Sequence, residues 1–348
     1  MKRIIFLLVG LIISVVSLLF ALQGIKLEAV RDALAGVQPL FFVLMIVPYV
    51  LPFLTKVIRW QVMFHTDQSR VPFRLLFSAL MISYIPLPFR AGEVARGAIA
   101  STRSGIPAPR VFSTILVEKV LDVLTLLLLL GISLPFISLP RTMQSTAVAL
   151  GVVVLVPSLF LLALVLQPAM SDKLVRLVSS RMPARLGARV HAAATQALQG
   201  LAPLSRPGIG LQLALWSLAI WVINAVAIWM LLFAFNFRVS FVVALVLTIA
   251  TNLSMGVPAA PGYIGTFELA VVAVMVALGL PKETSQTFAI MYHFIGLVPV
   301  AIIGVLALVS QGVGRAAFSR EEAARLSGSA TIETHSRRVV PVAPQDKR

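Results

Sequence analysis

Residues 83–100, SYIPLPFRAGEVARGAIA, place charged side chains inside an otherwise apolar part of the chain. Two prolines interrupt this stretch, and Arg90, Glu93 and Arg96 follow at positions i, i+3 and i+6. If a helix begins near Arg90, the three side chains share one of its faces. The start of a helix also presents free backbone N–H groups, which suit a phosphate or a carboxylate. The pattern therefore predicts an anion-binding group in apolar surroundings.

Three more acidic side chains lie in apolar runs. Glu118 and Asp122 are four residues apart and share one helix face. Lys119 lies about 100° round the same helix from Glu118, and Glu268 belongs to a later apolar run. Ionisable groups in such surroundings are costly unless they are paired or hydrated, and they mark a functional site by default.

Structural roles are the alternative for the same residues. Glu93 and Glu268 could cap short helices, and Glu118 could form a buried pair with Arg90 or Arg96 that fixes the fold. For the set as a whole we favour function, because a helical bundle is built at lower cost from apolar packing than from buried ions.

The composition predicts which elements position these groups. The chain is 59% hydrophobic and only 12% charged, with a mean hydropathy of +0.98, whereas soluble domains carry about 25% charged residues. Several apolar runs reach the length of about 20 residues that a helix needs to cross a bilayer. The sequence thus predicts an all-α integral membrane protein. It contains no cysteine, which excludes disulfides, thiolate metal sites and thiol nucleophiles.

Six spanning helices are predicted, at residues 4–22, 39–58, 111–134, 146–167, 210–235 and 285–309. The first has the charge order of a signal peptide, but its apolar run is too long, so we expect it to be retained. Two further apolar regions, 75–104 and 241–280, are interrupted by proline and glycine. Each predicts two half-length helices in a re-entrant hairpin, because non-helical backbone at membrane depth survives only inside protein or beside water.

The two interrupted regions resemble one another and predict an internal repeat. Each runs through proline, glycine, glutamate and a short helix to a Gly-X-Pro turn. Glu93 precedes Gly105 by 12 residues and Glu268 precedes Gly279 by 11. With a cytoplasmic N-terminus, the first hairpin enters from the cytoplasm and the second from outside. This is the inverted arrangement of many transporters, whose substrate site lies near the midplane.

His293 aligns within one residue of Glu118 when the repeats are superposed. It therefore either lines the same site or is a hydrogen-bonded histidine of the core.

The basic residues support this orientation. Residues 168–209 carry six basic side chains against Asp172 alone, and the predicted outer loops are nearly neutral. The preference of basic residues for cytoplasmic loops explains most of the net charge of +16, so we predict no nucleic-acid partner. The segment is also amphipathic, and it either lies on the anionic leaflet or packs on the bundle. A membrane domain of residues 1–315 is predicted to precede a disordered cytoplasmic tail, 316–348.

Three motifs, RAGEVAR, EKVLD and PAAPGYIGTFE, together resemble the signatures of the lysylphosphatidylglycerol synthase transmembrane-region family, also called the flippase-like domain family. The resemblance covers about residues 1–315. The motifs place the family's site residues at Arg90, Gly92, Glu93, Arg96, Glu118, Lys119, Asp122, Pro258, Pro261, Gly262, Gly265 and Glu268. Lys119 stands where arginine is usual and loses the bidentate geometry. Tyr263 stands where a second glycine is usual and narrows the loop.

The resemblance implies a multi-pass protein of a bacterial or archaeal inner membrane, with both termini cytoplasmic, that moves or presents lipids. In bifunctional members this domain flips aminoacylated phosphatidylglycerol made by a separate cytosolic domain. Only a short tail follows the last predicted span, so we expect no synthase domain here. We expect a lipid flippase that holds a phosphate-bearing headgroup with Arg90, Arg96 and Lys119. It would need no metal or cofactor, and its partner would be a second copy or a separate lipid-modifying enzyme.

Two other functions stay open. The first is an intramembrane transferase acting on an isoprenoid-phosphate or phospholipid substrate, because paired carboxylates can serve acid–base chemistry. The sequence has no Asp-x-Asp, His-Glu-x-x-His, Gly-x-Ser-x-Gly or nucleotide-binding P-loop motif, so we predict that the chain is not an enzyme. The second is an accessory subunit that recruits a partner through residues 168–209 or the tail.

Overall fold

The computed structural model describes residues 2–24, 27–64, 71–87, 91–138, 140–201, 206–256 and 259–310. All regular elements within these ranges are helical. They are α1 (Lys2–Leu22), α2 (Leu27–Ala35), α3 (Pro39–Leu44), α4 (Ile46–Phe64), α5 (Phe73–Ser83), α6 (Ala91–Ser104), α7 (Ala108–Ser133), α8 (Arg141–Leu166), α9 (Pro168–Ser180), α10 (Ala184–Leu201), α11 (Pro207–Ala234), α12 (Phe241–Ser254), α13 (Thr266–Ala277) and α14 (Lys282–Ser310), with short 3-10 turns at Leu134–Phe136 and Pro261–Tyr263.

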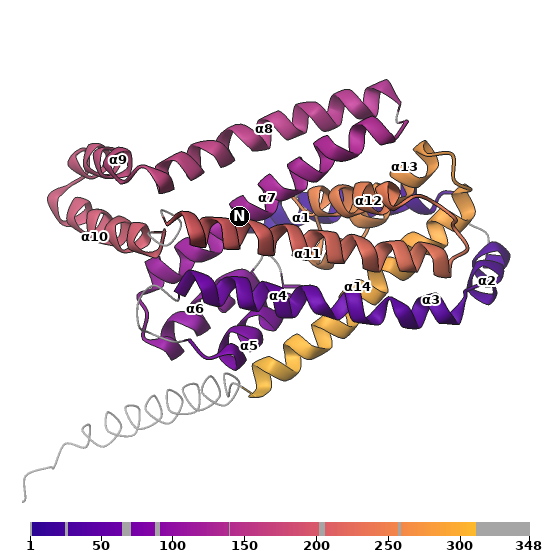
Figure 1. Ribbon diagram of the computed structural model, residues 1–348, viewed down its shortest axis with the longest axis horizontal. Coiled ribbons are helices and arrows are strands. Elements are labelled where there is room, and N and C mark those ends of the chain that lie inside the picture. The colour runs from indigo at the N-terminus through magenta and orange to yellow at the C-terminus, as the bar shows by residue number, and fades with distance from the viewer. Residues whose placement is uncertain are drawn as a thin grey trace, which may run out of the picture.

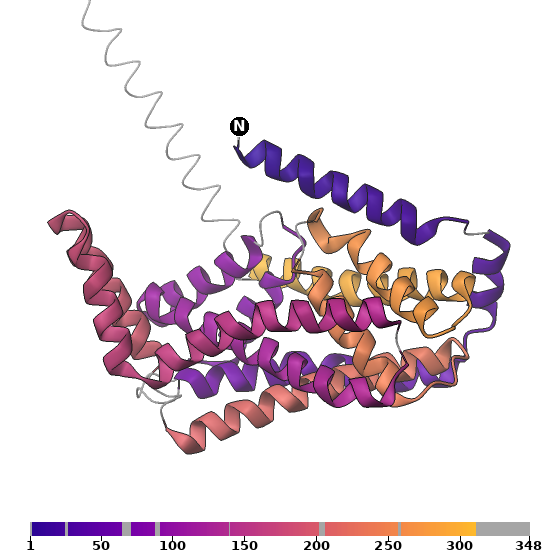
Figure 2. The same cartoon turned by 90° about the horizontal axis from the view of Figure 1, so that it is seen from above.

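The long helices lie along the long axis of the molecule (Figure 1). Among the described residues, four segments are long and apolar enough to cross a membrane, namely Pro39–Phe64, Gln144–Leu164, Pro207–Ala234 and Lys282–Ser310. By helix length and hydropathy the chain is therefore a multi-pass membrane protein. α7 has 26 residues but carries three charged side chains in its middle. α1 lies along one side of the bundle, against α13 (Figure 2).

The first predicted interruption is present between α5 and α6. α5 ends at Ser83, and α6 begins at Ala91. Gly92 closes the turn, because a Cβ at this position would lie 2.7 Å from the carbonyl oxygen of Ser83. Any larger residue would push the two short helices apart. Gly105, with φ +72°, ends α6 before the Ile106-Pro107 turn into α7.

The second predicted interruption is present between α12 and α13. Its loop contains Gly262 and Gly265, with φ of +79° and +94°, and Tyr263, with φ +59°. Tyr263 therefore occupies the left-handed region that favours glycine. A Cβ at Gly265 would lie 2.1 Å from the carbonyl oxygen of Ser14, and the Ala260 N–H donates to Ser14 Oγ at 2.7 Å. α1 thus holds this loop in place.

The tips of the two interrupted regions meet. A Cβ built on Gly262 would lie 3.7 Å from the Cβ of Pro86, which belongs to the first loop. The long helices also cross between halves, since α14 packs on α5 and α7 packs on α12. Gly304 permits the first of these contacts, because its Cβ would meet the Met81 carbonyl oxygen at 2.5 Å. The two halves of the chain therefore form one interlocked body.

The structure corrects the end of one predicted span and shows the helices of the predicted basic segment. The span predicted at 39–58 was wrong at its end, because α4 continues to Phe64 and buries Arg59 completely. The polar contacts of Arg59 described below allow the helix to continue. Within the predicted segment 168–209, Pro168–Ser180 and Ala184–Leu201 form α9 and α10. They lie beside the end of the bundle where α4 ends and α11 begins (Figure 1), and α10 packs on α7. The predicted tail, 316–348, lies outside the described residues.

Substitution of Gly265 tests the tight contact between α1 and the second loop. We expect Gly265→Ala to lower the free energy of unfolding by about 2 kcal/mol or more, through positive-φ strain and overlap with Ser14. Denaturation of the purified protein in mixed micelles, followed by tryptophan fluorescence, measures this. Gly131→Ala in α7 is the control, because its Cβ meets no atom within 4 Å. A smaller loss at Gly265 than at Gly131 would contradict the described loop.

Candidate functional site

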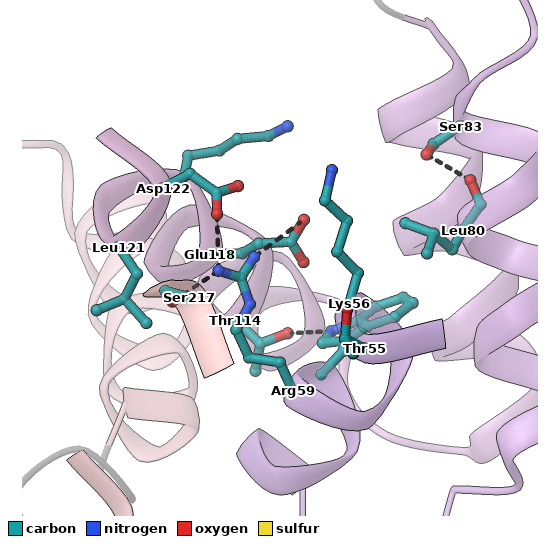
Figure 3. Close-up of polar contacts among 12 residues, drawn as sticks. Thr55, Lys56, Arg59, Leu80, Ser83, Thr114, Glu118, Leu121, Asp122 and Ser217 are labelled. Carbon is teal, nitrogen blue, oxygen red and sulfur yellow. Dashed lines mark hydrogen bonds and ion pairs between the residues drawn. The ribbon is translucent and has the colours of Figure 1, made fainter. Parts of the chain in front are cut away.

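A network of charged side chains connects α4, α6 and α7 inside the bundle. Figure 3 shows its part around Arg59, Glu118 and Asp122. Arg59 comes from α4 and Arg96 from α6, while Glu118 and Asp122 project from one face of α7, as their spacing predicted. The side chains of Arg59, Arg96 and Glu118 are at most 3% exposed. Such ions are stable only when they are paired and hydrogen-bonded.

Glu118 is the centre of the network. Arg96 NH1 donates to Glu118 Oε1 at 3.1 Å, and Arg96 NH2 donates to Oε2, which makes a bidentate pair. Arg59 NH2 lies 3.8 Å from the same carboxylate. The Arg96 guanidinium also stacks on the Trp60 ring at 3.9 Å, and Trp60 Nε1 donates to Thr114 Oγ1 at 2.9 Å. Arg96 is thus held along one edge by Glu118 and on one face by Trp60.

Asp122 binds the other arginine. Arg59 NH1 donates to Asp122 Oδ1 at 2.7 Å and to Ser217 Oγ on α11 at 2.8 Å. The same carboxylate oxygen accepts from Trp221 Nε1 at 3.2 Å. Lys56, one helical turn before Arg59 and Trp60, donates to the Tyr84 hydroxyl at 2.9 Å. α4, α5, α7 and α11 therefore meet at this group of side chains.

Two glutamates near the starts of short helices form the remaining pairs. Glu93 lies 2.8 Å from Lys119, and this pair is partly exposed. Glu268 lies 2.7 Å from Nδ1 of His293 and is almost completely buried. Glu268 Oε2 also accepts from the Gly265 N–H at 2.7 Å, and the Phe267 ring stacks on His293 with centroids 4.3 Å apart.

These two pairs occupy the same positions in the two halves of the chain. Glu93 and Glu268 are each the third residue of the second helix of an interrupted region. Lys119 and His293 are each the twelfth residue of the long helix that follows. The alignment of the two repeats in the sequence matched His293 with Glu118 to within one residue. The contacts in the structure show that Lys119, the next residue, is the equivalent of His293. The halves differ in that the Glu93–Lys119 pair is partly exposed, whereas the Glu268–His293 pair is buried.

The predicted site residues are thus brought together in part. Glu93, Arg96, Glu118, Lys119 and Asp122 form one cluster around α6 and α7. Gly92, Pro261, Gly262 and Gly265 shape the two loops, and Glu268 caps α13 beside His293. Arg90 and Pro258 lie outside the described residues.

Two of the predicted phosphate ligands already have carboxylate partners. Arg96 is buried against Glu118 and Lys119 is paired with Glu93, so neither presents a free charge. The structural alternatives that we kept open, a buried Arg96–Glu118 pair and a capping Glu268, therefore describe real contacts.

The sequence analysis missed several members of the network, which are Lys56, Arg59, Trp60, Tyr84, Ser217 and Trp221. The signal for the first two was present, since Lys56 and Arg59 break an apolar run and are spaced to share a helix face. We had placed Arg59 beyond the end of the span, where a basic residue needs no explanation. The hydroxyl groups of Tyr84 and Ser217 and the aromatic rings of Trp60 and Trp221 do not stand out in a single sequence.

Comparison with known proteins identifies the chain. The profile of the lysylphosphatidylglycerol synthase transmembrane region matches residues 7–304. The chain belongs to this family. The resemblance of the three motifs is thereby confirmed at the level of the family.

One curated relative is Glycosyltransferase AglD of Haloferax volcanii, which is 25% identical over 352 aligned positions. The alignment covers 90% of this chain but only 56% of AglD, so the chain spans little more than half the length of that relative. No solved structure gives a significant match.

Removal of Arg96 tests whether the bidentate pair holds the family's first two motifs together. We expect Arg96→Gln to lower the free energy of unfolding by about 3–5 kcal/mol, because Glu118 keeps a buried charge without its main partner. Lys119→Gln is the matched control and should cost less than about 1 kcal/mol, since its pair with Glu93 is partly exposed. Denaturant titration in mixed micelles measures both. Similar losses for the two variants would contradict the burial of the network.

Proposed function

We propose that this chain moves a phosphate-bearing lipid across the membrane through the charged region between two inverted repeats. The observation that carries the proposal is the buried network of Arg59, Arg96, Glu118 and Asp122 beside an interrupted helix pair. Buried ions add little net stability relative to apolar packing, and in a membrane bundle they mark a pathway for a polar substrate. A lipid headgroup is such a substrate.

Three features support the inverted repeat. The Glu93–Lys119 and Glu268–His293 pairs occupy equivalent helix positions. α7 and α14, the long helices that follow each pair, run in opposite directions along the long axis (Figure 1). The loops of the two halves lie close together, since a Cβ built on Gly262 would lie 3.7 Å from the Cβ of Pro86. Transporters built in this way place substrate between the repeats and expose it alternately to the two sides.

The basic end of the molecule gives the proposed orientation. α9 and α10 lie at the end where α4 ends and α7 and α11 begin (Figure 1). They carry Lys173, Arg176, Arg185 and Arg189, and Arg181 directly follows α9. The positive-inside preference assigns this end to the cytoplasm. Under this assignment the first loop enters from the cytoplasm and the second from outside. We place the protein in an inner membrane.

A lipid translocation assay tests the proposal. In proteoliposomes that contain fluorescently labelled phosphatidylglycerol, we expect the protein to accelerate exchange between leaflets. Glu93→Gln should slow this exchange at least 10-fold, because it releases Lys119 and changes the charge of the pathway. Glu28→Gln in α2, an exposed carboxylate away from the network, should leave the rate unchanged. Equal rates for wild type, both variants and protein-free liposomes would contradict the proposal.

A transferase is the second candidate, and the name of the relative AglD favours it. The chain would then act on a lipid-linked substrate, with carboxylates of the network as acid and base. Incubation of the purified protein with a polyprenyl phosphate and an activated sugar, followed by mass spectrometry of the lipids, distinguishes the two. A glycosylated lipid product would favour the transferase, and its absence from a preparation that exchanges labelled lipid would favour translocation.

A further inference from the structure

The network contains more positive charge than its carboxylates neutralise. Its described members are the cations Lys56, Arg59, Arg96 and Lys119 and the carboxylates Glu93, Glu118 and Asp122. Arg59, Arg96 and Lys119 each lie within 4.0 Å of a carboxylate. Lys56 has no carboxylate this close among the described residues and donates to a neutral hydroxyl instead. One positive charge is therefore in excess, and it belongs to Lys56.

The hydrogen-bond donors of the network are also in excess. Within the described part of the chain, Arg59 Nε, Arg59 NH2 and Arg96 Nε are buried and have no hydrogen-bond acceptor. A buried donor without a partner costs about 1–3 kcal/mol, and more when it is charged. Charge and donor count are independent measures, and both indicate that an anionic acceptor would complete this group.

We propose that Lys56 and the Tyr84 hydroxyl bind the phosphate of the transported lipid. This inference rests on the proposed function and names the residues that recognise the substrate. Because the Lys56 ammonium donates to the Tyr84 oxygen, the Tyr84 O–H keeps its own hydrogen for an anion. The Lys56 ammonium also lies 5.2 Å from the Trp221 ring centroid and 5.6 Å from that of Tyr84. These rings hold the ammonium without neutralising it.

The position of this pair fits a substrate that passes between the repeats. Tyr84 directly follows α5, two residues before Pro86, which lies close to Gly262 in the loop of the other half. In Figure 3 the Lys56 side chain extends from α4 toward the side on which the Glu118 carboxylate lies. The proposed phosphate site therefore lies at the junction of the two halves, next to the buried network.

A lipid rather than a soluble phosphate is favoured by an apolar groove that two aromatic ring contacts connect to this pair. The groove has a volume of about 540 Å³ and is lined by residues of α3, α4 and α14, including Tyr49, Phe294 and Val298, and by Met45 between α3 and α4. Edge-to-face contacts join it to the phosphate site, from Tyr49 to Phe53 at 5.7 Å and from Phe53 to Tyr84 at 5.4 Å. An acyl chain in the groove would place a phosphate near Lys56.

Calorimetric titration of the full-length protein in detergent tests the site without relying on transport. We expect dihexanoyl phosphatidylglycerol to bind wild type and to bind Lys56→Gln at least 10-fold more weakly, because a charge-assisted contact is lost. Tyr84→Phe should weaken binding about 3-fold or more. Lys56→Arg, which keeps the charge, should stay within about 3-fold of wild type. Lys282→Gln removes an exposed charge at the start of α14 and is the control.

Two further ligands decide the source of the phosphate. Dihexanoyl glycerol, which has no phosphate, should bind Lys56→Gln and wild type equally, and glycerol 1-phosphate should bind much more weakly than the lipid. Equal lipid binding by Lys56→Gln and wild type would overturn the inference, as would equal weakening for the phosphate-free lipid. Lys56-dependent binding of glycerol 1-phosphate with the affinity of the lipid would overturn the lipid assignment. If wild type binds through Lys56 but exchanges no lipid in proteoliposomes, the proposed function fails and the phosphate site stands.

Discussion

The structure depends on the neutralisation of buried ions by partners on other helices. Glu118 and Asp122 bring two carboxylates into the interior on α7, and they are stable there because α4 and α6 supply Arg59 and Arg96. Each of these side chains would be an uncompensated charge if its helix moved away. The same contacts therefore join α4, α6 and α7 and set the position of the first interrupted pair of helices. Packing of apolar side chains alone would not specify this arrangement so narrowly.

The two halves of the chain place a side-chain pair at the same helix positions, but the residues of the two pairs differ. In the first half the equivalent pair is Glu93 with Lys119, which is partly exposed and carries a fixed cation. In the second half it is Glu268 with His293, which is buried and bonded to the loop backbone through Gly265. The first half therefore has a partly exposed cation at this position, whereas the second half ties the same position to a loop that packs against α1. This division agrees with the location of Lys56 and both arginines on the first side.

The sequence predicted the elements better than the contacts. Apolar length and proline–glycine breaks identified the long helices and both interruptions, because hydrocarbon forces every spanning segment to be helical. The carboxylates of α7 were recognised since charge in an apolar run is conspicuous. Arg59 was not, because a basic residue near a helix end can equally belong to the cytoplasmic surface. The partners of Arg96 and Lys119 depend on how α6 and α7 cross, and a single sequence does not give the position of one helix relative to the other.

The central claim, that the two interrupted loops meet tip to tip, can be measured by cross-linking in this cysteine-free chain. The Cβ positions of residues 86 and 262 are 3.7 Å apart, a separation suited to a disulfide. The account predicts that the double variant Pro86→Cys/Gly262→Cys forms an intrachain disulfide under mild oxidation in membranes, while Pro86→Cys/Gly131→Cys does not. A folded double variant whose cysteines at 86 and 262 stay reduced would contradict the account.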